Sequence, residues 1–159
     1  MSKKLKASAQ KVQVAVNNLG FEFTIVEFSE TTRTSADAAS AIGCSVGQIA
    51  KTLVFRTVET NTAILVIASG INRVNVITLS IHLDEKIELA DADFVRQLTG
   101  FAIGGVPPVG HLTPIITLID EDLFQYEEIW AAAGTPNAVF RLKPDELQRM
   151  TGGTTLTIQ

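Results

Sequence analysis

The centre of the chain reads Thr52-Leu-Val-Phe-Arg-Thr-Val58, Glu59-Thr-Asn-Thr62 and Ala63-Ile-Leu-Val-Ile-Ala68. The first and last of these runs are rich in β-branched and other apolar residues, which favour strands. The polar run between them is short enough to be the turn of a hairpin. We therefore predict an antiparallel pair of strands over residues 52–58 and 63–68, and we expect this pair to form the centre of the domain.

On either side of this hairpin the chain alternates between helical and extended patterns. Helices are predicted where apolar residues recur every three or four positions and where a capping residue or a closing glycine marks an end. The expected helices cover residues 5–19, 35–42, 76–83, 92–98 and 144–150, with one further turn at 45–51. The other expected strands cover residues 21–25, 86–89, 115–119, 128–132, 138–142 and 154–158. Because the chain has neither a repeat nor a linker, we predict a single α+β domain over residues 1–159, with a mixed, mostly antiparallel sheet surrounded by short helices.

The composition excludes several classes of protein. The 159 residues are 46% hydrophobic and 19% charged, values typical of globular domains and not of disordered or fibrous chains. The longest strongly apolar run, residues 63–68, is far shorter than the roughly 18–20 residues that span a bilayer, so no membrane partner is expected. The basic start, from Met1 to Ser8, lacks the apolar block of an export signal. With a single cysteine, Cys44, the chain fits a reducing, cytoplasmic location.

The formal net charge of −4 limits the partners further. A wide, sequence-independent grip on nucleic acid requires the neutralisation of many phosphates, so DNA is not an expected partner. A local contact with the end of a nucleic acid remains open.

Familiar catalytic motifs are weak in this sequence. The stretch Gly43-Cys-Ser-Val-Gly47 has the form G-x-S-x-G, but a helix is predicted before it instead of the required strand. Ser45 is therefore expected to cap a turn, and the neighbouring Cys44 to be a small buried thiol. His82 and His111 lack the H-E-x-x-H spacing, so no metal site is expected. The acidic residues at turns, such as those at 120–122, are predicted to be solvated helix caps.

Two features suggest chemistry. Lys51 lies between a capped turn and an apolar strand, where a lysine could simply favour a helix C-terminus. Gly104-Gly-Val-Pro-Pro108 combines glycines that permit close backbone approach with prolines that fix the loop, and it could also be no more than a turn. Together, one ammonium and a rigid loop with free N–H groups would form a site for an anion or a carbonyl oxygen that needs no side-chain nucleophile.

With these residues in view, the sequence resembles the bacterial prolyl-tRNA synthetase editing domains and their YbaK-like aminoacyl-tRNA deacylase relatives. The resemblance extends over about residues 20–153, and its pieces occur in matching order and spacing. The pieces are Thr32-Arg-Thr-Ser-Ala-Asp-Ala-Ala39, Ile49-Ala-Lys-Thr-Leu53, Ile71-Asn-Arg-Val-Asn75, Leu98-Thr-Gly-Phe-Ala-Ile-Gly-Gly-Val-Pro-Pro108, Ala131-Ala-Ala-Gly134 and Val139-Phe-Arg-Leu142.

The resemblance implies a curled sheet and an editing deacylase that acts in trans on the ester of mischarged tRNA, with mischarged tRNA-Pro as the expected substrate. The implied partners are the 3′ aminoacyl end of the tRNA and prolyl-tRNA synthetase, and no cofactor or metal is implied. A reading from another class remains open, in which the same cleft is a non-catalytic binding module for an amino acid, a nucleotide or the end of a tRNA.

The resemblance also assigns roles to residues of this chain. Lys51 is expected near the terminal adenosine, and the loop that matches the family's G-x-x-x-P motif is expected to shape the aminoacyl pocket. The implied catalytic residues are Lys51, Gly104 and Gly105, and the implied substrate-binding residues are Arg73, Asn75, Val106, Pro107, Pro108 and His111. We expect the cleft to lie between the hairpin and the loop of residues 104–110. On this reading, Gly105→Val should damage hydrolysis more than folding.

Overall fold

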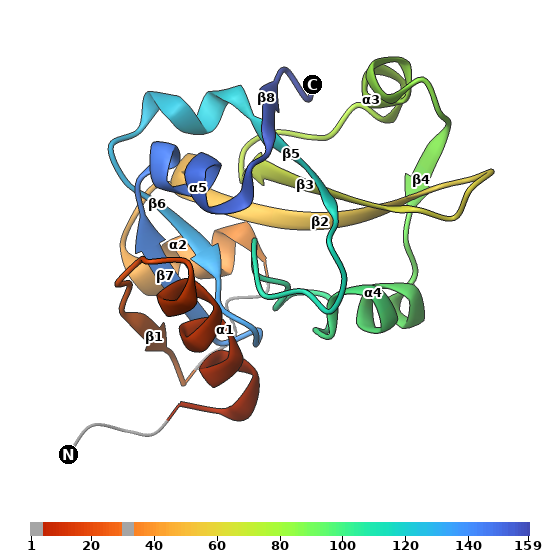
Figure 1. The fold of residues 1–159 in the computed structure, drawn as a ribbon. Coiled ribbons are helices and arrows are strands. Elements are labelled where there is room, and N and C mark those ends of the chain that lie inside the picture. Colours follow the sequence, from red (N-terminus) through yellow and green to blue (C-terminus); the bar gives the residue numbers. More distant parts are fainter. Residues whose placement is uncertain (1–4, 30–33) are drawn as a thin grey trace.

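The computed structural model describes residues 5–29 and 34–159, and the predicted hairpin runs through its centre (Figure 1). Strands β2 (Ile49–Thr57) and β3 (Ala63–Ser69) pair antiparallel, from Ala50 opposite Ser69 to Arg56 opposite Ala63. The predicted hairpin is thus confirmed, although β2 begins at Ile49 instead of Thr52. Residues 32 and 33, which open the first piece of the resemblance, lie outside the described residues.

Short helices and strands surround the hairpin. The helices are α1 (Ala7–Asn18), α2 (Ser35–Ile42), α3 (Val76–Leu83), α4 (Ala92–Thr99) and α5 (Pro144–Thr151), with the 3₁₀ turns η1 (Val46–Gln48) and η2 (Glu121–Gln125). The other strands are β1 (Ile25–Glu27), β4 (Ile87–Leu89), β5 (Ile116–Asp120), β6 (Ile129–Ala132), β7 (Ala138–Leu142) and β8 (Thr154–Leu156). The predicted α+β class is confirmed.

The strands form one mixed sheet in the order β1-β7-β6-β2-β3-β5-β8, with β4 also paired to β2. The pairs β1–β7, β6–β7, β2–β3 and β2–β4 are antiparallel. The pairs β2–β6, β3–β5 and β5–β8 are parallel, because longer connections carry the chain back before each of these strands.

One edge of β2 is divided between two partners, and this division creates an opening in the sheet. Ile49 and Ala50 pair with β6, whereas the segment from Phe55 to Thr57 pairs with β4. Among the described strands, none pairs with the intervening stretch of residues 51–53 on this edge. The backbone and side chains of this stretch therefore remain available to line a site.

Strand β3 is buried along its whole length, which explains its continuous apolar run. Leu65 and Ile67 face one core cluster, together with residues of α1, α4 and α5. Ile64 and Val66 face a second cluster, together with residues of α3, β4 and β8. Figure 1 accordingly shows α3 and α4 on opposite sides of the hairpin. A strand that is covered on both faces needs apolar side chains at every position.

The predicted helix caps are largely confirmed by local geometry. The Thr34 hydroxyl accepts a hydrogen bond from the N–H of Asp37 at 3.0 Å, and Gly43 ends α2 with a positive φ of 85°. Asp91 caps α4 in the same way, through the N–H of Phe94 at 2.9 Å. Within the described residues, no helix is long and apolar enough to cross a membrane.

The strand predicted at 21–25 was wrong in its position, since β1 covers Ile25–Glu27. The alternating aromatic residues pack into the core without joining the sheet. The rings of Phe21 and Phe23 stack with centroids 5.5 Å apart, and Phe23 also lies 5.4 Å from the ring of Phe140. The alternation of aromatic and polar residues at 21–25 therefore reflects packing of the rings into the core and not the pairing of a strand.

Candidate functional site

The divided edge of β2 lines a cleft with a volume of about 410 Å³. The opposite walls come from α2, from the loop after α4 and from the neighbouring strands β6 and β7. The lining residues include Lys51, Thr52, Gly104 and Val106, and the remainder are mostly small or apolar: Thr34, Ser35, Ala38, Ile49, Ala50, Leu53, Gly70, Ile103, Trp130, Ala131, Ala132 and Val139. The cleft thus brings the β2 lysine and the glycine-proline loop together, as predicted.

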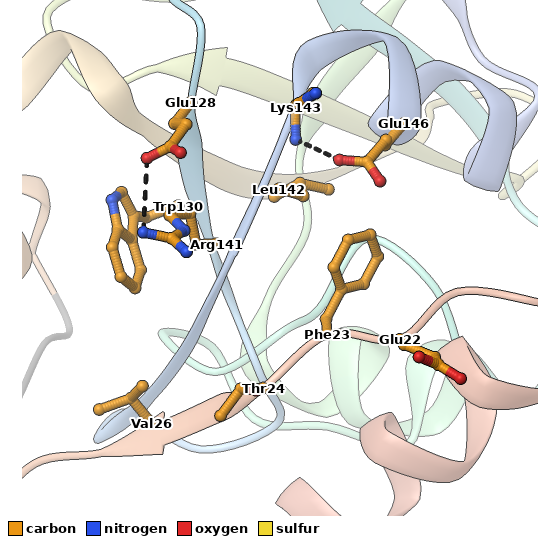
Figure 2. A pocket seen from close by; sticks show the side chains of 10 residues that line it. All are labelled: Glu22, Phe23, Thr24, Val26, Glu128, Trp130, Arg141, Leu142, Lys143 and Glu146. Atoms are coloured by element: carbon orange, nitrogen blue, oxygen red, sulfur yellow. Dashed lines mark hydrogen bonds and ion pairs between the residues drawn. The ribbon is translucent and has the colours of Figure 1, made fainter.

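A second hollow, of about 490 Å³, adjoins this cleft through Trp130, which lines both (Figure 2). Two of its charged side chains pair with each other, and a third accepts a backbone hydrogen bond. Arg141 lies 3.6 Å from the carboxylate of Glu128, and the carboxylate of Glu146 accepts a hydrogen bond from the backbone N–H of Lys143 at 2.8 Å. None of the residues predicted for catalysis or binding lines this hollow.

Lys51 is half-buried at the start of β2, and its ammonium donates a hydrogen bond to the backbone carbonyl of Asn72 at 2.7 Å. Burial lowers the pKa of the Lys51 ammonium, and the positive charge of Arg73 lowers it further. The carboxylate of Asp120 acts in the opposite direction and raises the pKa of Lys51. Because an ammonium group carries three N–H donors, the bond to Asn72 fixes its position and leaves donors for a ligand.

The loop after α4 lines the cleft and carries unpaired backbone donors. Gly104 has a φ of +92°, a conformation that favours glycine. In the described part of the chain, the N–H groups of Gly104 and Val106 have no hydrogen-bond acceptor. Unpaired backbone N–H groups beside a cationic side chain can hold an anion or a carbonyl oxygen on which negative charge develops.

Gly105 plays a different part from the one predicted. Its N–H donates to the carbonyl of Ala102 at 3.0 Å, and its own carbonyl accepts from the N–H of Gly134 at 2.9 Å. A Cβ at this position would lie 2.8 Å from the Cα and the carbonyl carbon of Thr135. We therefore expect Gly105→Val to impair folding as well as hydrolysis, because the loop packs backbone against backbone and has no space for a side chain.

The other predicted binding residues lie outside the cleft. Arg73 is exposed, and the side chain of Asn75 caps α3 by accepting from the N–H of Thr78 at 3.1 Å. Both line a shallow depression of their own. Pro108 and His111 line another depression, and the Nε2 of His111 lies 2.7 Å from the carbonyl oxygen of Pro107. Of these residues, Arg73 influences the cleft from outside, because its positive charge lowers the pKa of Lys51.

The structure also explains the G-x-S-x-G match. The N–H of Ser45 donates to the side-chain oxygen of Gln48 at 3.0 Å, and its hydroxyl lies 3.1 Å from the same oxygen. Burial raises the pKa of the Cys44 thiol, which disfavours the nucleophilic thiolate. These contacts support the predicted capping role of the segment.

Two groups at the site were missed by sequence reasoning. Asp120, expected to be solvated, is only 1% exposed and accepts hydrogen bonds from the N–H of Ser69 at 3.0 Å and from the side chain of Asn72 at 2.8 Å. Its position at the end of an apolar strand was the available signal. The Oγ1 of Thr52 is buried in the cleft wall and has no hydrogen-bond partner among the described residues.

His111 predicts a pH dependence of stability. Burial lowers the pKa of His111 below its ordinary value of 6.5, and the hydrogen bond to Pro107 offsets this effect in part. The unfolded chain therefore binds a proton more readily than the folded chain, so the free energy of unfolding should fall as the pH drops from about 6.5 through the lower folded-state pKa. Thermal unfolding measured across this range should show a smaller loss for His111→Gln, which keeps a donor for the Pro107 carbonyl. The control His82→Gln, which replaces an exposed imidazole, should behave like the parent; equal pH profiles for all three proteins would contradict the assignment.

Comparison with known proteins adds to this geometry. Residues 29–150 match the family described as Aminoacyl-tRNA editing domain. A solved structure of a candidate trans-editing enzyme for prolyl tRNA synthetase superposes with a TM-score of 0.93 and 45% identity, and the match covers 98% of this chain and 99% of that one. The uncharacterized protein YwhH of Bacillus subtilis is 29% identical over 140 residues, or 88% of each chain. A candidate Cys-tRNA(Pro)/Cys-tRNA(Cys) deacylase, EbsC of Enterococcus faecalis, is 27% identical over 127 residues, or 79% of this chain and 77% of that one.

Proposed function

Because the chain belongs to the aminoacyl-tRNA editing domain family, we propose that it is a deacylase that acts in trans and hydrolyses the ester bond of mischarged tRNA. The observation that carries this proposal is the placement of the Lys51 ammonium in one cleft with the unpaired N–H groups of Gly104 and Val106. Such a cleft suits a reaction in which water attacks an ester carbonyl and negative charge develops on the carbonyl oxygen.

The chemistry of the substrate supports a site without a side-chain nucleophile. The cationic α-amino group makes an aminoacyl ester labile, so the protein has to orient the ester, admit one water molecule and stabilise the oxyanion. In the proposed reaction, the oxygen of water forms a new bond to the carbonyl carbon while the loop N–H groups bond the developing oxyanion. The ester bond to the ribose oxygen of the terminal adenosine then breaks, and a proton from the water passes to that oxygen. The free ribose hydroxyl of the substrate helps to orient the water.

Lys51 is proposed to hold the nucleic-acid end of the substrate. Its ammonium has donors left after the bond to Asn72, and these can bond the terminal ribose or its phosphate. Among the described residues that line the cleft, Lys51 is the only cation, which is consistent with a protein of net charge −4 that contacts the tip of the tRNA and not a long stretch of its backbone.

The apolar wall of the cleft is proposed to select the amino acid. Its small residues, such as Ala50 and Ala131, leave room for a compact side chain, and they offer no charged partner to one that is ionised. The candidate trans-editing enzyme and the candidate Cys-tRNA(Pro) deacylase among the relatives favour tRNA-Pro carrying a small wrong amino acid as the substrate. Prolyl-tRNA synthetase is the proposed functional partner, because the similar solved structure is described as a candidate trans-editing enzyme for that synthetase.

The decisive experiment is a deacylation assay with a panel of aminoacylated tRNAs. The panel contains tRNA-Pro charged with alanine, cysteine, serine or proline, and a matched tRNA-Ala charged with alanine. We expect hydrolysis of at least one mischarged tRNA-Pro, sparing of the proline ester, and no loss of activity in a chelator. Tight binding of the aminoacylated 3′ end without hydrolysis of any member would instead favour the non-catalytic binding module.

A further inference from the structure

A cluster of hydrogen-bonded polar residues lies beside the proposed site. Its members come from three parts of the chain that are distant in sequence: residues 69–72, residues 120–122 and Gln159. Asp120, at the end of β5, is 1% exposed, and Asn72, on the loop after β3, is 4% exposed. One carboxylate oxygen of Asp120 accepts from Ser69 and Asn72, and the other accepts from the N–H of Asp122 at 2.9 Å. The two oxygens of this side chain thus accept hydrogen bonds from three N–H donors.

Asn72 is held from both ends of its side chain. Its amide nitrogen donates to Asp120 at 2.8 Å and to the carboxylate of Asp122 at 2.7 Å. Its amide oxygen accepts a hydrogen bond from the side chain of Gln159. The backbone of this residue is therefore strongly fixed, and its carbonyl is the group that accepts from the Lys51 ammonium.

The energetic logic favours a role beyond simple stability. A buried carboxylate without full ion pairing is costly, and an apolar side chain could fill the end of a strand at lower cost. Here the Asp120 carboxylate holds the side chain of Asn72, and the backbone carbonyl of Asn72 anchors the Lys51 ammonium. Arg73, on the same loop, repels that cation and the Asp120 carboxylate attracts it, while the hydrogen bond to the Asn72 carbonyl holds the ammonium at one position.

We propose that Asp120 is a positioning residue for the deacylation: through Asn72 it fixes the carbonyl that orients the Lys51 ammonium toward the cleft. This role rests on the proposed function, because the orientation matters to the reaction only if Lys51 holds the substrate. Asp120 itself touches Asn72 and not the cleft. Its contribution is the alignment of a group that has to meet the tRNA end to within a fraction of an ångström.

The test compares Asn72→Ala and Asp120→Asn with a stability control, Thr57→Val. Asn72→Ala removes the link to Asp120 and leaves every charge in the cluster unchanged, and Asp120→Asn replaces one acceptor with a donor. Thr57 is also buried and hydrogen-bonded, through the N–H of Thr62 at 2.8 Å, but it lies at the far end of β2. The Lys51 ammonium is followed by NMR in the free protein, with its signal assigned by loss in Lys51→Arg, and single-turnover deacylation is measured on the same variants.

For Asn72→Ala and Asp120→Asn, we expect a changed Lys51 signal with faster exchange of the ammonium protons. We also expect single-turnover deacylation at saturating enzyme to be about tenfold to hundredfold slower, which is the effect of a misplaced reacting group. Thr57→Val should lower the melting temperature without either change. Lys51 signals like those of the parent in both cluster variants would overturn the proposal, as would shifted signals with turnover within twofold of the parent. If the parent hydrolyses no substrate, the proposed function fails, while the NMR measurement still decides whether Asp120 positions Lys51.

Discussion

Replacing Lys51 with alanine is expected to lower the rate of deacylation about a hundredfold or more, an effect comparable to the loss of one preorganised donor at a reacting centre. The variant should remain folded. The substitution removes the hydrogen bond from the ammonium to Asn72 and the attraction of Asp120, and it also removes the desolvation of a half-buried cation and its repulsion by Arg73. The net change in the free energy of unfolding should be about 1 kcal/mol or less, which moves the melting temperature of a domain of this size by a few degrees.

Lys51→Arg serves as the matched control for charge. The guanidinium keeps the positive charge but replaces a compact ammonium with a planar group. We therefore expect it to restore binding of the tRNA end better than turnover, since a displaced ester loses its alignment with the loop donors. Single-turnover rates and equilibrium binding of a non-hydrolysable 3′ end separate these two quantities. Parent-like hydrolysis by Lys51→Ala, on a substrate that the parent cleaves, would leave Lys51 as an ordinary lysine beside the cleft.

Substitution of Gly105 is expected to affect both folding and activity. A Cβ at this position would lie 2.8 Å from the backbone of Thr135, and backbone atoms cannot give way as the end of a flexible side chain can. Overpacking of this kind costs about 1–3 kcal/mol, so Gly105→Ala should lower the free energy of unfolding by that amount and Gly105→Val by more. The displaced loop also carries the N–H groups of Gly104 and Val106, and deacylation should fall more than tenfold even where the protein is folded.

Gly152→Ala is the matched control for this prediction. Gly152 ends α5 with a φ of +66°, and a Cβ there would meet no atom within 4 Å. This variant should pay only the backbone strain of a left-handed alanine, about 1 kcal/mol, and should keep its deacylation rate. Thermal unfolding and single-turnover assays on the two variants distinguish the effects. A Gly105→Ala protein as stable and active as the parent would show that the loop accommodates a side chain by moving.

The α+β class and most elements of the fold could be predicted from local patterns. Thr34 and Asp91 cap helices as expected, because a short polar side chain before an apolar helical stripe has a suitable N–H within reach wherever the helix lies. The hairpin was equally accessible, since its two strands adjoin a short turn. The first strand was predicted at the wrong position because the alternation of Phe21 and Phe23 with polar residues comes from the packing of their rings.

The candidate site was predicted in part. Lys51, Gly104 and Val106 share the cleft. His111 and Asn75 do not, although Asn75 ends one segment that carries the resemblance and His111 follows three residues after another. Sequence proximity to a loop or a motif indicates that a residue is near the site in the chain, but the direction of its side chain depends on the turn that it occupies. His111 turns back to the Pro107 carbonyl, and Asn75 turns to the N-terminus of α3.

Local patterns were enough to predict the helix caps, the central hairpin, the glycine and proline positions of the loop, and the lack of a familiar catalytic motif, because each of these depends on residues that are close together in the chain. Contacts between distant segments could not be predicted in this way: Asp120 is buried against Ser69, 51 residues away, the Asn72 carbonyl holds Lys51, and a Cβ on Gly105 would meet the backbone of Thr135. The contact between Asp120 and Ser69 depends on the register of β5 against β3, and the other two depend on how loops pack against other parts of the chain. A shift of one residue in that register would exchange the two faces of a strand and leave the local sequence patterns unchanged.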